Sequence, residues 1–148
     1  MDLPIKNPAE LSARLELSAS ERLLLVDPPE ALESLARTVR EGRGETDVAE
    51  GRKIRTVKQS YDAIIVWRED RVGSQAVFEA VVKRLDRAGV LWAVVALKKV
   101  QGVSTPAAHR LELSDLVKAF SKTGLRNDRE ARVSPWHVAY RFAASQPT

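Results

Sequence analysis

Three continuous apolar runs constrain the fold of this 148-residue chain more than any other feature. They are "LLLV" at 23–26, "YDAIIVW" at 61–67 and "VLWAVVAL" at 90–97. Runs of strand length that are apolar on both faces are typical of central strands covered by helices on both sides. None of them approaches the roughly 20 residues that a membrane-spanning helix needs. We therefore expect a buried, mostly parallel sheet.

Segments with the spacing of amphipathic helices separate these runs, because their apolar residues recur every three or four positions. Asn7 and Ser114 are suited to cap the first and the last of them, and Gly89 and Gly124 stand where a helix is expected to stop. The predicted helices cover 7–17, 28–40, 73–89 and 114–124.

The end of the chain has a different period. In "PWHVAYRFA", 135–143, apolar and polar residues alternate, which is typical of a strand with unlike faces. The segment "REARV", 129–133, can pair with it across Ser134 and Pro135. We expect an antiparallel hairpin here.

The alternation of strands and helices predicts a three-layer α/β fold with a mostly parallel sheet. We interpret residues 1–148 as a single Rossmann-like domain with a C-terminal antiparallel hairpin, a feature of the methyltransferase branch. The N-terminal helix belongs to residues 1–20. Residues 41–60 are rich in glycine and charge and are expected to be partly irregular, with a short strand at 53–57.

The loop after the first run reads "DPPE", which resembles the Asp-Pro-Pro-Tyr signature of amino-methylating enzymes. That signature needs an aromatic fourth residue, here Glu30, and a glycine-rich cofactor loop, which the seven glycines do not form. We interpret Asp27 as a helix cap, Pro28 and Pro29 as the first helical turn, and Glu30 as part of a capping box. Asp47 has the spacing of a ribose-binding acid, but an acid in a charged loop is usually only solvated.

The candidate ligand site follows the third run, where the carboxyl ends of parallel strands are expected to meet. Two cations with hydroxyl groups and a glycine can hold a phosphate or carboxylate group. The alternative is a solvated surface loop. The candidate residues are Lys98, Lys99, Gly102, Ser104 and Thr105.

Composition argues against several kinds of chemistry. The chain has no cysteine, so it has no thiol nucleophile and no disulfide. Its only histidines are His109 and His137, which disfavours a metal site, and a lone histidine rarely indicates catalysis. We therefore predict no metal and no catalytic residues. Core packing is the expected role of Trp67 and Trp92.

The net charge of +4 and the pI of about 9.6 permit a polyanionic partner without requiring one. Arg52, Lys53, Arg55 and Lys58 form a basic cluster, but no aromatic residues lie between them, so a nucleic-acid partner is disfavoured. We expect no membrane association. The N-terminus lacks the pattern of a secretory signal, so we expect a cytoplasmic location.

From "RLLLVDPPEAL" to "WHVAYRF" the chain resembles a small bacterial family of unknown function, whose members look like truncated, methyltransferase-like Rossmann domains. It departs from that family in "LELSASER", 15–22. The resemblance implies a fold rather than an activity. The positions that carry it are Pro28, Tyr61, Asp62, Leu91, Trp92, Lys98, Lys99, Gly102, Val103, Thr105, Gly124, Leu125 and Trp136.

The function that we expect is that of a non-catalytic, Rossmann-like binding module without a cofactor. Its partner would be an anionic small ligand or another protein. The first alternative is a divergent methyltransferase that depends on S-adenosylmethionine, and the second is a weak nucleic-acid binder. The sequence indicates no oligomeric state.

Overall fold

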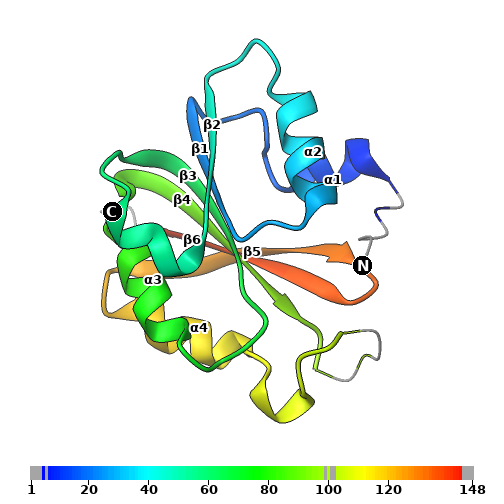
Figure 1. Ribbon diagram of the computed structural model, residues 1–148, viewed down its shortest axis with the longest axis vertical. Helices are drawn as coiled ribbons and strands as arrows, with labels where there is room; N and C mark the ends of the chain where they lie inside the picture. The colour runs from blue at the N-terminus through cyan, green and yellow to red at the C-terminus, as the bar shows by residue number, and fades with distance from the viewer. Residues whose placement is uncertain (1–4, 6, 99, 101–102, 145–148) are drawn as a thin grey trace.

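The computed structural model describes residues 5, 7–98, 100 and 103–144. Six strands form one sheet in the order β2-β1-β3-β4-β6-β5 (Figure 1). The predicted apolar runs form β1 (Arg22–Val26), β3 (Tyr61–Trp67) and most of β4 (Leu85–Ala96), which pair in parallel, and β2 (Glu45–Ala49) pairs in parallel with β1. The predicted hairpin is formed by β5 (Leu125–Ser134) and β6 (His137–Ala144), and β6 is antiparallel to both β4 and β5. The predicted fold class is confirmed.

Helices cover both faces of the sheet. On one face lie α1 (Pro8–Arg14) and α2 (Glu30–Val39), and on the other lie α3 (Ser74–Val82) and α4 (Leu113–Ser121) (Figure 1). Two short 3₁₀ helices, η1 (Gly51–Thr56) and η2 (Ala107–His109), lie in the connections. No helix among the described residues is long and apolar enough to cross a membrane.

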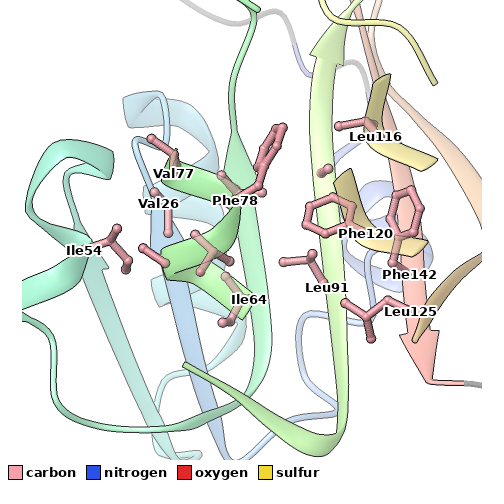
Figure 2. Packing of buried hydrophobic residues seen from close by; sticks show 14 of the residues in the cluster. Val26, Ile54, Ile64, Val77, Phe78, Leu91, Leu116, Phe120, Leu125 and Phe142 are labelled. Carbon is pink, nitrogen blue, oxygen red and sulfur yellow. The ribbon is translucent and has the colours of Figure 1, made fainter. Parts of the chain in front are cut away.

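Successive side chains of each central strand point to opposite faces, so the sheet separates two apolar clusters. Trp92 is 1% exposed and lies in the cluster beneath α1 and α2, which confirms its predicted place in the core. In the other cluster the rings of Phe78, Phe120 and Phe142 follow one another, with centroids 5.1 and 4.9 Å apart (Figure 2). This cluster joins α3 and α4 to the sheet.

The segment 41–60 differs from the prediction. Its strand is β2, Glu45–Ala49, and the predicted strand at 53–57 is mostly the 3₁₀ helix η1. A buried guanidinium supports this edge of the sheet: Arg40, only 3% exposed, donates to the carbonyl groups of Leu17 and Glu45 at 2.8 and 2.9 Å. Charged residues can therefore form an ordered strand here, because Arg40 satisfies the backbone around it.

Two helix boundaries also differ from the prediction. The helix α3 ends at Val82, and Gly89 lies inside β4 rather than at a helix end. The helix α4 begins at Leu113, where Glu112 and Asp115 form a reciprocal capping box, so Ser114 is not the cap.

Candidate functional site

The carboxyl ends of β1, β2 and β3 meet at one edge of the sheet, and each is followed by an acidic residue. Asp27 follows β1, Glu50 follows β2, and Glu69 follows β3. The antiparallel strand β6 begins at the same edge, because His137 pairs with Ala96 at the end of β4. In open α/β sheets this edge is where ligands bind.

Asp27 connects the ends of β1 and β2. Its backbone is in the left-handed region, with φ of 51°, and its Oδ2 accepts a hydrogen bond from the N–H of Gly51 at 3.0 Å. A Cβ at Gly51 would lie 2.7 Å from that oxygen, so a larger residue there would displace the Asp27 carboxylate. The prediction that Asp27 caps α2 is wrong: the helix begins at Glu30, with Pro29 as a cap residue that makes no side-chain hydrogen bond.

Glu50 is the acid at the end of β2, and it is exposed. It accepts a hydrogen bond from Arg52 Nε at 2.7 Å, and this contact lowers the pKa of the Glu50 carboxyl. Asp47, which sequence spacing suggested for a ribose, lies inside β2 and accepts a hydrogen bond from the Tyr61 hydroxyl at 2.7 Å. Burial, reinforced by this bond, raises the pKa of Tyr61. A correct prediction of β2 from the sequence would have placed Glu50 at its carboxyl end and made it a candidate site residue.

A chain of hydrogen bonds joins the end of β3 to the turn between β5 and β6. The Oε2 of Glu69 lies 2.5 Å from Nε2 of His137, and Nδ1 of His137 lies 2.9 Å from Oγ of Ser134. The N–H of Trp136 donates to the same Oγ at 3.0 Å. The Ser134 hydroxyl can then donate to Nδ1, which places the proton of a neutral imidazole on Nε2, facing Glu69.

This series of hydrogen bonds is shielded from solvent at His137 and accessible to solvent at Glu69. The side chain of His137 is 6% exposed, whereas that of Glu69 is 23% exposed. The ring of Trp67 packs on that of His137, with centroids 4.5 Å apart. The hydrogen bond from His137 is the largest of the contacts that lower the pKa of Glu69, and Thr105 donates a further one at 3.1 Å. Glu69 is therefore a carboxylate that hydrogen bonds fix in position and that remains accessible to solvent.

The loop after β4 is organised by Arg110. Arg110 is only 6% exposed, and its guanidinium group donates hydrogen bonds to several carbonyl groups of the loop. They are those of Leu97, Lys98, Val100 and Thr105, at 2.8 to 3.0 Å. Arg110 thereby fixes the segment that brings Thr105 to Glu69.

The side chains of the described candidate ligand residues have different partners in the structure. Lys98 is exposed and pairs with Glu112 at 2.7 Å, while Thr105 contacts Glu69. Ser104 is exposed. Lys99 and Gly102 lie outside the described residues, and the role of this loop in holding an anion stays a prediction. Sequence reasoning missed Glu69 and assigned His137 no function, because their contact spans 68 positions.

A cavity of about 310 Å³ lies between α1 and the β5–β6 turn. Leu11, Val133 and Pro135 give it an apolar lining, and Ser134 contributes to its wall. The series of hydrogen bonds thus extends from Glu69 to Ser134, which borders a cavity large enough for a small organic group.

Comparison with solved structures supports the fold, whereas two other comparisons found no match. No protein-family model matches the chain, and no curated protein matches it. Among solved structures, a SAM-dependent methyltransferase from Aquifex aeolicus superimposes with a TM-score of 0.70 at 13% identity, over 94% of this chain and 90% of that one. The N-methyltransferase NodS from Bradyrhizobium japonicum gives a TM-score of 0.58 at 13% identity, over 95% and 99% of the two chains.

A third structure contains the demethylated cofactor. The O-methyltransferase NcsB1 from neocarzinostatin biosynthesis, in complex with S-adenosyl-L-homocysteine, gives a TM-score of 0.67 at 11% identity. It is matched over 93% of this chain, which spans 56% of that enzyme. The chain spans most of the Aquifex and Bradyrhizobium proteins, so these matches give no support to the idea of a truncated domain.

These findings correct two expectations. The sequence favours a non-catalytic module over a methyltransferase and indicates no cofactor. The three solved structures named above are instead methyltransferases; one is described as SAM-dependent and one contains S-adenosyl-L-homocysteine. The absence of a glycine-rich loop is therefore a weak argument against a methyltransferase. Identities of 11–13% establish the fold alone, so activity is argued below from the residues of this chain.

Proposed function

We propose that this protein binds S-adenosylmethionine over the carboxyl ends of β1, β2 and β3 and transfers its methyl group to an acceptor held at Glu69. The observation that carries this proposal is the acidic residue after each of these strands. S-adenosylmethionine has an ammonium group, a sulfonium group and a ribose diol, so carboxylates suit both its positive charges and its hydroxyl groups.

The residues at this edge fit most of that cofactor. Glu50 is an exposed acid at the end of the second strand, the place from which carboxylates hold ribose hydroxyls in this class of fold. Asp27, held in place by Gly51, can accept from the ammonium group. Pro28 and Pro29 have no N–H, so the loop offers few donors to the cofactor carboxylate. Binding would therefore depend on side-chain acids more than on backbone donors. When bound, the cofactor supplies an electrophilic methyl group.

Glu69 would hold the acceptor through an N–H or O–H group. The hydrogen bond from His137 keeps the pKa of Glu69 low, so the carboxylate remains ionised and can accept from a neutral donor. A fixed carboxylate would also stabilise the positive charge that grows on the acceptor nitrogen or oxygen as its bond to the methyl carbon forms and the carbon–sulfur bond breaks, with S-adenosylhomocysteine as the leaving group. The N–H or O–H proton of the acceptor would then pass to Glu69 or to solvent. His137 and Ser134 are positioning residues in this scheme, because both act through Glu69.

Isothermal titration calorimetry with S-adenosylmethionine and S-adenosylhomocysteine tests the proposal. We expect one site per chain with micromolar affinity. Glu50→Gln should weaken binding about tenfold, since it removes a charge-assisted hydrogen bond. Glu41→Gln, at an exposed acid in the α2–β2 connection, is the matched control and should bind like the natural protein. Absence of heat with either compound up to about 1 mM would refute the proposed function.

A further inference from the structure

The two helical layers of the protein differ in charge. Segments 51–58, 74–87 and 113–124, which include η1, α3 and α4, contain nine Lys and Arg residues against three Asp and Glu residues. On the opposite face, α1 and α2 contain two Arg residues against three Glu residues. The positive charge of the protein is therefore concentrated on one side.

The cations of the two layers also differ in their partners. In α1 and α2, Arg14 pairs with Glu10, and Arg37 pairs with Glu33 at 3.1 Å. No carboxylate of the described residues lies within ion-pair distance of Arg55, Lys83, Arg84, Arg87 or Arg126. We call these five residues the cationic face.

The cationic face lies at the amino edge of the sheet, away from Glu69. A hollow of about 290 Å³ between η1 and the end of α3 is lined by three cationic residues, Arg55, Lys83 and Arg84, and by one acidic residue, Glu79. The Nε of Arg84 is buried, and within the described part of the chain it has no hydrogen-bond partner. The lining of a second hollow, of about 610 Å³, includes two cationic residues, Arg87 and Arg126, and one acidic residue, Asp86. In Figure 1, η1 is the short coil in residues 51–56 that lies beside α3, and the two elements contact each other.

Contrary to the expectation from the sequence, we propose that the cationic face binds the phosphodiester backbone of a nucleic acid duplex. Unpaired cations spread over two hollows suit a row of phosphates better than a single small anion. Four of the five side chains are arginines, whose planar guanidinium groups match phosphate oxygens.

Other polyanions and other forms of nucleic acid fit less well. The exposed large apolar side chains among the described residues are Val48, Val72 and Val117, and none belongs to the cationic face. The face thus has no aromatic platform for stacking unpaired bases and no apolar group to insert into a lipid surface. It should read the backbone of a duplex without regard to sequence.

Fluorescence anisotropy with labelled 20-base-pair RNA and DNA duplexes, carried out on the full chain between about 50 and 200 mM salt, tests this inference. Five phosphate contacts predict that log Kobs falls with log salt with a slope as steep as about −4.5. The triple variant R55Q/K83Q/R87Q should bind at least tenfold more weakly at the lowest salt, with a slope reduced by about 2 to 3.

The matched control is R37Q/R43Q/R129Q, which removes the same amount of charge from exposed residues elsewhere. It should change affinity less than threefold. Equal weakening by both variants, or no binding of the natural chain at about 50 mM salt, would overturn the inference. So would binding to phosphatidylserine vesicles without binding to either duplex. The R55Q/K83Q/R87Q variant should bind S-adenosylmethionine like the natural protein. A failure of this inference can therefore be distinguished from a failure of the proposed function.

Discussion

The two halves of the carboxyl edge are built in different ways. Over β1 and β2 the backbone sets the shape, through two prolines, Asp27 in a left-handed conformation and a close approach at Gly51. Over β3, β4 and β6 side chains set the shape, through the chain from Glu69 to Ser134 and through Arg110. The first half thus depends mainly on backbone conformation, and the second depends on side-chain hydrogen bonds. Removing a side chain should therefore cost more in the second half.

The largest effect is expected at Arg110. Arg110→Ala leaves at least four loop carbonyl groups without the donor that now satisfies them. We expect a loss of about 3 kcal/mol in the free energy of unfolding, since buried groups left unpaired carry a desolvation penalty. Chemical denaturation at neutral pH measures it. A loss below about 1 kcal/mol would show that the loop finds other donors, and the contrast between the halves would fail.

The next effect concerns Glu69 and is also a prediction about pH. The pKa of Glu69 is lowered in the folded protein from an ordinary value of 4.5, so its stabilisation is present above that value and is lost as pH falls below it. Glu69→Gln should cost about 1.5 kcal/mol at pH 7, because a charged hydrogen bond becomes neutral.

Urea denaturation of both proteins between about pH 7 and pH 3 measures this difference. The two stability curves should converge as the pH falls below 4.5. A constant gap across that range would mean that the Glu69 charge does not contribute to stability. The cofactor affinity of Glu69→Gln should match that of the natural protein, since the proposed role of Glu69 concerns the acceptor.

The contrast also explains what the sequence could predict. The runs that became β1, β3 and β4 and the alternating tail were sufficient for the fold class, because period and apolarity are local signals. Strand β2 has no local signal in the sequence, because none of its residues is fully buried and because Arg40, which supports it, lies outside the segment. The pairing of His137 with Glu69 has no local signal at all.

A smaller effect is expected in the first half. Gly51→Ala places a methyl group 2.7 Å from Asp27 Oδ2, and the contacting atom ends a side chain that can rotate. We expect a cost of about 1 kcal/mol, with reduced cofactor affinity. In an Asp27→Ala background the same change should cost less, because the clashing oxygen is gone. Additive costs in the double-mutant cycle would show that Asp27 does not fill the space beside Gly51.

The smallest effect on stability is expected for the double change Lys98→Ala, Lys99→Ala. The Lys98–Glu112 pair is largely exposed, with side chains 64% and 37% accessible, so its loss should cost less than about 0.5 kcal/mol. The same change should weaken any ligand with a phosphate or carboxylate group about tenfold if the loop after β4 holds that group. Thermal shift with nucleotides, acyl-coenzyme A and sugar phosphates compares the two proteins. A compound that stabilises both equally would exclude these lysines from its site. A compound that stabilises only the natural protein would place an anionic group beside the loop that Arg110 holds in position.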